Sequence, residues 1–179
     1  MKDLLELLDA MARKKDEVSD TRELFLDMAE RVVKVVSQTF GCKSDEVAIL
    51  IVTADTKHLR FAAPRKFCDL GTIPVTKRDS IAVNVLGKKV GEAMNNVPMV
   101  KHVAFFETVK LRDKAVPIQK MITVPILNHG DAVGVAQISR KGETPAAAGP
   151  DFGPGDVRKA QEFFEAVAPH LVQARPARF

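Results

Sequence analysis

The sequence predicts an α/β (α+β) sandwich, in which helices cover a mostly antiparallel sheet. Two observations predict it. Apolar residues recur at helical spacing near the two ends of the chain, and β-branched or alternating apolar runs fill the middle. The chain has 179 residues, 46% of them hydrophobic and 28% charged, which suits one globular domain.

Two helices are expected at the start of the chain. Residues 3–13 place leucines at helical spacing opposite acidic side chains, which is the pattern of an amphipathic helix. After a polar break, Asp20 or Thr21 can cap a second helix that runs to about Phe40 and ends at Gly41. We therefore expect residues 1–19 to form an N-terminal helix and linker ahead of the domain.

The second helix carries more apolar surface than one stripe requires. Val33 and Val35 widen the face that Val32 and Val36 already form. A helix that is apolar over more than one stripe usually packs against two things, here the core and a partner subunit. The sequence thus favours a homodimer formed through the terminal helices.

Strands are expected next. The β-branched run 47–53 predicts a buried strand, 55–57 a hairpin turn, and 58–62 a second strand. Residues 64–79 have the composition of a loop, with an extended stretch at 73–75 beside a proline.

A short helix and a short strand follow this loop. Asp79 or Ser80 can cap a helix over 81–86, which Gly87 is expected to stop, and 89–93 is a strand candidate.

The second half of the chain predicts a long hairpin. An irregular span over 94–119 precedes a strand at 121–127, a turn at 128–131 and a partner strand at 132–139. Pro125 should lie at an edge or a bulge, because proline cannot donate to a β-ladder.

The chain is expected to close with a loop over 141–155 and a helix that Gly155 and Asp156 open. Pro169 predicts a kink or an early end of that helix. The domain should span 20–173, and residues 174–179 should form a frayed tail.

Charge and composition exclude several classes of function. The net charge of +4 is no nucleic-acid signature by itself, although residues 57–114 hold twelve basic and five acidic side chains. That basic stretch is either a solvated face or an anion-binding surface. No apolar run is long enough to span a membrane, the first residues do not form a signal peptide, and the cytoplasm is the expected compartment.

Three segments then carry a resemblance to a known family. Residues 73–90 run from Ile-Pro through a short helix to Gly-x-x-Val. Residues 121–138 contain Val-Pro-Ile, then a glycine, and then Val-Gly-Val-Ala-Gln-Ile. Residues 152–156 have the sequence Phe-Gly-Pro-Gly-Asp. In this order and spacing the segments resemble the GAF domain family over about residues 20–172. The resemblance implies a six-stranded antiparallel sheet with the terminal helices on one face and a ligand pocket on the other. It also implies a sensor or dimerisation module.

The cyclic-nucleotide-binding members of this family carry an N-K … F-x-x-x-D-E pattern. Lys141, Phe152 and Asp156 match that pattern, whereas Arg140 and Val157 stand where Asn and Glu are needed. We therefore expect a Lys141–Asp156 ion pair that ties strand to helix, rather than a cyclic-nucleotide site.

Cysteine chemistry known in the family fits poorly. A bilin site is disfavoured because Cys68 has no flanking histidine, and the pair Cys42 and Cys68 does not match the cysteine set of the methionine-R-sulfoxide reductases. Arg65 and Lys66 should lower the pKa of Cys68, so a redox role stays open. The four histidines are scattered, which favours neither metal nor haem.

The implied pocket would lie under the helix 81–86 and the irregular span. Its expected ligand-binding residues are Phe61, Ile73, Ile81, Asn84, Val85, Met94, His102, Phe105, Phe106, Arg112 and Thr123, and Val100, Ile122 and Val124 would add apolar wall. Lys77 and Arg78 before the helix favour a small anionic or amphipathic ligand. Alternatively, Phe105 and Phe106 simply fill the cavity.

Three functions are compatible with the sequence. The first is a standalone sensor that binds a small molecule and signals through a homodimer. The second is a ligand-free module that docks to a separate kinase or regulator. The third is a cysteine-based redox enzyme. The sequence contains no catalytic constellation and predicts no enzyme, cofactor, metal, nucleic-acid or membrane partner.

Overall fold

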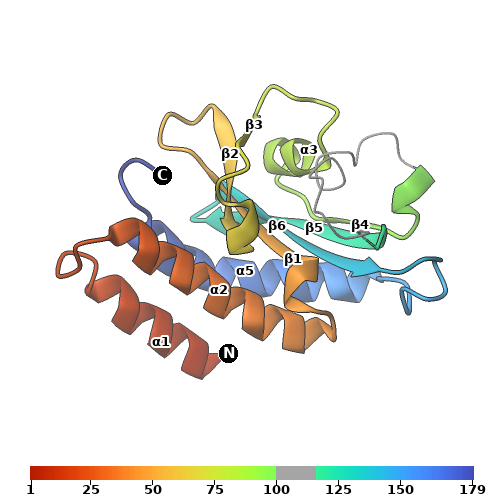
Figure 1. Ribbon diagram of the computed structural model, residues 1–179, viewed down its shortest axis with the longest axis horizontal. Coiled ribbons are helices and arrows are strands. Elements are labelled where there is room, and N and C mark those ends of the chain that lie inside the picture. Colours follow the sequence, from red (N-terminus) through yellow and green to blue (C-terminus); the bar gives the residue numbers. More distant parts are fainter. Residues whose placement is uncertain (100–115) are drawn as a thin grey trace.

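The computed structural model describes residues 1–99 and 116–179. Its centre is one sheet of six antiparallel strands in the order β3-β2-β1-β6-β5-β4 (Figure 1). The strands are β1 (Val47–Val52), β2 (His58–Ala63), β3 (Thr72–Pro74), β4 (Glu92–Met94), β5 (Ile118–Asn128) and β6 (Asp131–Lys141). The predicted sandwich with a six-stranded antiparallel sheet is confirmed.

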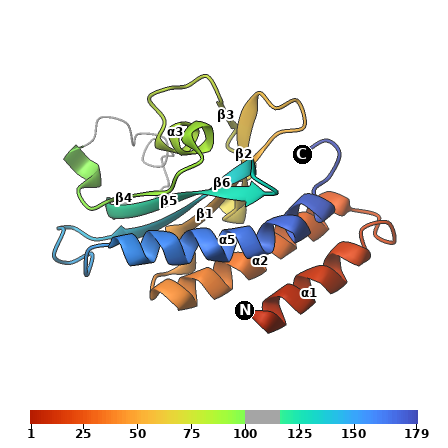
Figure 2. The same ribbon diagram turned by 180° about the vertical axis from the view of Figure 1, so that it is seen from behind.

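Helices cover both faces of this sheet. They are α1 (Lys2–Arg13), α2 (Thr21–Phe40), α3 (Ile81–Lys88) and α5 (Pro154–Ala174), with single turns at η1 (Ser44–Glu46), η2 (Arg65–Phe67) and η3 (Val97–Met99). Figures 1 and 2 show α2 and α5 against one face and α3 over the other. We call α1, α2 and α5 the helix layer, and the face under α3 the distal face.

Capping residues set both ends of α2 and the start of α3 where the sequence placed them. The Glu23 N–H donates to Asp20 Oδ1 at 2.9 Å, and Gly41 ends α2 in the left-handed conformation with φ 62°. Ser80 caps α3, but that helix continues through Gly87, and Lys89 takes the left-handed position instead. The Lys89 Nζ donates to Gly130 O at 2.7 Å, which holds this end of α3 against the β5–β6 turn.

The sheet divides the apolar core into two clusters, one on each of its faces. On β5, Ile122, Val124 and Ile126 pack against the helix layer, whereas Met121 joins the distal face. The expectation that Ile122 and Val124 line the distal pocket is therefore wrong. Side chains alternate along a strand, so these two cannot share a face with Thr123.

Pro125 is accommodated where the sheet is incomplete. The strand β4 pairs only with the three residues Met121–Thr123 of β5, so the described residues place no strand beside Pro125 on that side. Pro125 therefore lies at an edge of the sheet, as predicted, although another part of β5 has a strand on each side.

The last helix is longer than predicted. It begins at Pro154 and continues past Pro169 to Ala174, so the expected early end at this proline is wrong. Pro169 is exposed, and water can satisfy the carbonyl that its missing N–H leaves unpaired.

The segment after α5 differs from the frayed tail that the sequence predicted. Phe179 is only 3% exposed, and its ring meets that of Phe25 edge to face at 4.8 Å. Its carbonyl accepts a hydrogen bond from the Ala54 N–H at 3.2 Å. An aromatic side chain buried against α2 anchors this segment.

The expected Lys141–Asp156 ion pair is wrong as well. Lys141 Nζ pairs with Asp45 Oδ2 at 2.8 Å, while Asp156 Oδ2 accepts the Gly153 N–H at 2.8 Å. Asp156 is thereby engaged in capping its own helix, and Lys141 reaches the turn η1 on the other side of β6.

The wide apolar surface of α2 is covered largely from within the chain. Helix α1 packs against both α2 and α5, and Val33 and Val36 are buried in the single chain. Val35 stays half-buried. The homodimer accordingly remains a prediction, with less apolar surface to support it than the sequence suggested.

No helix among residues 1–99 and 116–179 combines the length and the apolar composition that crossing a bilayer requires.

Gly134 permits a close approach of β6 to β1. It lies on β6 opposite Ile51, and a Cβ at this position would stand 2.3 Å from the backbone oxygen of Leu50. We predict that Gly134→Ala lowers the free energy of unfolding by about 3 kcal/mol, because a backbone carbonyl cannot move aside without opening the β1–β6 ladder.

Urea unfolding followed by circular dichroism measures this loss. Gly155→Ala in α5 is the matched control, since an added Cβ there meets nothing within 4 Å and alanine favours a helix. Equal stability of the two variants would contradict the close approach at Gly134.

Candidate ligand site on the distal face

The distal face carries a second apolar cluster, separated by the sheet from the helix-side core. Leu50, Phe61, Val85, Met121 and Val135 are among its buried members, drawn from four strands and α3. We call this set and its neighbours the distal cluster. Each central strand therefore buries both of its faces, as expected of a sheet covered on both sides.

Most described residues of the predicted site lie in this cluster. Phe61, Ile73, Ile81 and Val85 are buried in it, and Met94 packs against it. Thr123 is buried on the same face, and Asn84 is half-buried on α3. Val100, His102, Phe105, Phe106 and Arg112 lie outside the described residues, and a role in ligand binding stays a prediction for the whole set.

Phe67 belongs to the site region although the sequence analysis placed it in a loop. Its ring lies 5.5 Å from that of Phe61, and its side chain is buried. The turn η2 that carries it forms too short a segment for apolar periodicity to reveal. A phenylalanine in a polar loop was the one available signal.

The turn η2 is fastened to α2. Arg65 pairs with Glu23 at 2.6 Å and with Asp27, and its backbone N–H donates to Glu30 Oε1 at 2.8 Å. These three carboxylates follow one side of α2. Phe67, two residues after Arg65, is packed in the distal cluster, so η2 connects the helix layer with the distal face.

A row of polar side chains crosses the distal face. Thr123 on β5 pairs with Gln137 on β6 and with Glu92 on β4, and Ala48 on β1 pairs with Gln137. Paired residues of antiparallel strands project to the same side. We call Glu92, Thr123 and Gln137 the polar rung.

The polar rung is buried at its inner end, and its hydrogen-bonding groups are not all paired. Thr123 is 1% exposed and Gln137 is 5% exposed, while Glu92 is half-buried at the edge of the sheet. Gln137 Nε2 donates to Thr123 Oγ1 at 3.3 Å, but Gln137 Oε1 has no hydrogen-bond partner among the described residues. A buried polar atom without a partner is uncommon and destabilising.

The sequence analysis selected Thr123 but missed Gln137 and Glu92. The available signal for Gln137 was a polar residue two positions after Val135 in an apolar strand. Glu92 could be associated with Thr123 only after the pairing of β4 with β5 was known.

Both cysteines lie away from this site. Cys68 is buried in the helix-side core, and Cys42 packs against that core. Burial raises the pKa of each thiol to about 11. The expectation that Arg65 lowers the pKa of Cys68 overall is wrong, because desolvation outweighs Arg22 and Arg65, and Arg65 is also neutralised by its own carboxylates.

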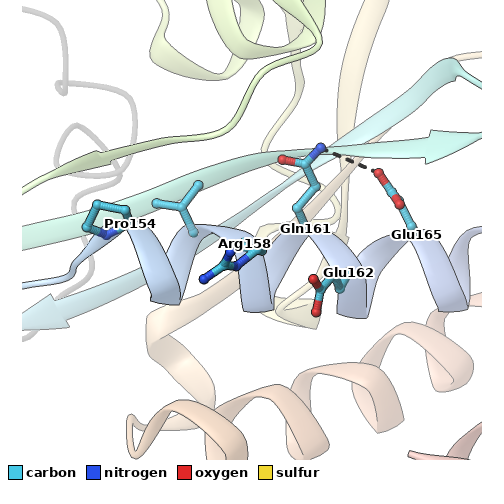
Figure 3. A pocket seen from close by; sticks show the side chains of 6 residues that line it. Pro154, Arg158, Gln161, Glu162 and Glu165 are labelled. Carbon is cyan, nitrogen blue, oxygen red and sulfur yellow. Dashed lines mark hydrogen bonds between the residues drawn. The ribbon is translucent and has the colours of Figure 1, made fainter.

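A surface hollow of about 360 Å³ runs along the N-terminal half of α5 (Figure 3). Its lining residues are Pro154, Val157, Arg158, Gln161, Glu162 and Glu165. Gln161 Nε2 donates to Glu165 Oε1 at 3.4 Å, and the two side chains face each other along the helix. The hollow is open and lined by both charges, and it has no residue in common with the predicted site.

The part of the chain that the structure describes contains no group of three or more histidine, cysteine or acidic residues placed to hold a metal ion.

Comparison with known proteins identifies the fold. No protein-family model matches the sequence, and no curated protein does. Among solved structures, the chain is similar to the GAF domain of an Acinetobacter phosphoenolpyruvate-protein phosphotransferase, with a TM-score of 0.62 and 10% identity over 96% of this chain and 94% of that one. It is similar to the corresponding GAF domain from Coxiella burnetii, with a TM-score of 0.65 and 11% identity over the same shares.

An enzyme shares the architecture. The free methionine-R-sulfoxide reductase from Neisseria meningitidis, solved with its substrate, matches with a TM-score of 0.57 and 15% identity over 96% of this chain and 90% of that one. At these identities the likeness concerns the fold alone.

We predict that both thiols react slowly in the native protein. With a pKa of about 11, roughly 0.1% of either thiol is ionised at pH 8, and the thiolate is the reactive form. Labelling with a disulfide reagent should be slow at pH 8, fast in guanidinium, and faster in the native state as the pH approaches 11.

Because the folded state holds these protons more tightly than an unfolded thiol does, their contribution to stability should be lost as the pH rises from about 9 through 11. Rapid labelling of the native protein at pH 8 would contradict the assigned burial.

Proposed function

Because the chain has the fold of a GAF domain, we propose that it is a sensory or regulatory module that binds a small molecule at the distal cluster and signals through a homodimer. The polar rung supports this proposal most directly. A face that served packing alone would be more stable with apolar residues at Thr123 and Gln137, since polar groups cost free energy when they are buried without full pairing.

The proposed ligand is small and anionic or amphipathic. The distal cluster is apolar and suits a hydrophobic group, and the polar rung can orient a polar one. Lys77 and Arg78 lie in the turn before α3, where they add positive charge at the border of the same face.

The turn η2 offers a route for the signal. A ligand that displaced Phe67 would pull on Arg65, which is bound to Glu23 and Asp27 of α2. Helix α2 belongs to the layer through which two copies would associate. Occupancy of the distal face would then be coupled to the arrangement of the dimer.

Two other functions are less well supported. A ligand-free docking module, which would act on a separate kinase or regulator, gives no reason for the buried polar rung. A cysteine-based redox enzyme needs an accessible thiolate, whereas burial raises the pKa of both thiols and Cys68 lies on the opposite side of the sheet from the distal cluster. We therefore propose a module without enzymatic activity.

Native and denaturing mass spectrometry of the purified protein tests ligand binding. We expect a small extra mass in the native spectrum that disappears on denaturation. Ala48→Leu should remove this mass, because a larger side chain would occupy the space beside Gln137, and Gly155→Ala on α5 should retain it. A native spectrum without any extra mass, at all protein concentrations, would favour the docking module.

Light scattering at micromolar concentration tests the homodimer. We expect twice the mass of the 19.6 kDa chain for the wild type. Val35→Arg should shift the protein to the monomer, because it places a charge on the half-buried side of α2. Lys88→Glu on α3, in the opposite layer, is the control and should stay dimeric. A monomeric wild type would overturn signalling through a homodimer.

A further inference from the structure

The polar rung defines what a ligand must present to it. Its three side chains lie in one row on β4, β5 and β6, and the row continues into Ala48 on β1. Ala48 is the smallest side chain of the row and stands next to Gln137, whose Oε1 has no hydrogen-bond partner within residues 1–99 and 116–179. The unsatisfied group is therefore bordered by little bulk on that side.

The hydrogen-bonding groups of the rung can be counted. Gln137 Nε2 donates one of its two N–H groups to Thr123 Oγ1, which leaves the second N–H and the Thr123 hydroxyl proton as donors and Gln137 Oε1 as an acceptor. If the amide is turned over, Thr123 donates to Gln137 and the amide N–H₂ becomes the free donor, while Thr123 Oγ1 keeps an acceptor site. In both orientations the pair presents two donors and an acceptor side by side.

Glu92 adds acceptors only. An ionised carboxylate has no proton to donate, and the described residues form no ion pair or hydrogen bond with that of Glu92. A negatively charged group placed on the rung would meet this carboxylate in either orientation of the Gln137 amide. The rung thus disfavours a carboxylate or phosphate and suits a neutral group that has N–H donors together with an acceptor.

We infer that the polar rung binds a neutral planar amide or nitrogen heterocycle that carries an N–H donor beside a carbonyl or ring-nitrogen acceptor. The apolar part of this ligand would pack against Met121 and Val135 of the distal cluster, which flank the rung on β5 and β6. This inference rests on the proposed function of the distal face and narrows it: the ligand is amphipathic, and any acidic group that it has lies away from the rung.

Benzamide is the probe that tests this chemistry. It combines an apolar ring with an amide that has both N–H donors and an acceptor. Two compounds of similar shape serve as comparisons: N,N-dimethylbenzamide lacks the donors, and benzoate replaces them with a negative charge. In ¹⁵N-edited NMR spectra of the full chain, we expect benzamide alone to cause saturable shifts of the Gln137 side-chain amide.

Variants of the rung separate binding from structure. Gln137→Met and Thr123→Val should each weaken benzamide binding about tenfold, the usual effect of losing one buried hydrogen bond. Gln119→Met is the matched control: Gln119 is also 5% exposed, but its Nε2 donates to Gly142 O at 2.8 Å. The control should bind benzamide as the wild type does.

Thermal unfolding provides a second measurement. Gln137→Met should unfold at about the same temperature as the ligand-free wild type, because it removes an acceptor without a partner among the described residues together with the 3.3 Å hydrogen bond to Thr123, and the two effects offset each other. Gln119→Met should unfold at a lower temperature, since it leaves the Gly142 carbonyl unpaired.

The outcomes are distinguishable. The inference is overturned if dimethylbenzamide binds as well as benzamide, if Gln137→Met and Thr123→Val leave benzamide binding unchanged, or if Gln137→Met destabilises the protein as much as Gln119→Met. Binding of benzoate in place of benzamide would also overturn it, yet would leave the distal face as a ligand site. Loss of the proposed function itself would instead appear as no binding of any probe and no extra mass in the native spectrum.

Discussion

The pairing of β5 with β6 is the constraint on which the other features of this fold depend. The two strands are joined by a tight turn and pair along almost their whole length, from Ile118 with Lys141 to Asn128 with Asp131. A shift of one residue would exchange the two faces of either strand. A slip of β5 would move Ile122 and Val124 out of the helix-side core and Thr123 off the distal face, whereas a slip of β6 would move Gln137 off that face. The register of one hairpin thereby decides which residues enter the helix-side core and which lie on the distal face.

The two faces of the sheet differ in what they bury. The helix side is the larger apolar core and includes Phe25, Val32 and Phe164, whose burial contributes to the stability of the domain. The distal side adds a polar rung to an apolar cluster. The rung lowers stability in the absence of a partner, and natural proteins accept such a loss mainly where function requires it. The difference between the faces is thus the physical basis of the proposed ligand site.

The turn η2 is the point where the two faces meet. Phe67 lies in the distal cluster, whereas the next residue, Cys68, lies in the helix-side core. Arg65 binds carboxylates on α2 through both its guanidinium and its backbone N–H. Individual exposed ion pairs contribute little to stability, but several that hold one short turn fix its position. The proposed signal would pass from the distal face to the helix layer through these contacts of η2.

Local sequence determined most of the secondary structure. The caps at Asp20 and Ser80, the glycine at the end of α2 and the apolar runs of β1 and β6 act over a few residues, so they could be read directly. The resemblance of three segments to GAF domains supplied the order of the layers, and with it Phe61, Ile73, Ile81, Val85 and Thr123 as members of one face. Errors arose where a local pattern has two solutions. A lysine can pair with either of two acidic residues, and a terminal phenylalanine can fray or pack.

Only the tertiary structure determined which distant segments of the chain lie side by side. Thr123 was recognisable as a polar residue in a strand, but Gln137 and Glu92 join it only because β6 and β4 flank β5 in this register. The pKa of Cys68 was misjudged from its charged neighbours in sequence, since burial, which outweighs those charges, depends on how η2 packs. The wide apolar surface of α2 likewise gained its covering from α1 of the same chain. Sequence determines which local structures are stable, whereas burial, pairing and the environment of a charge arise only when separate segments are brought together.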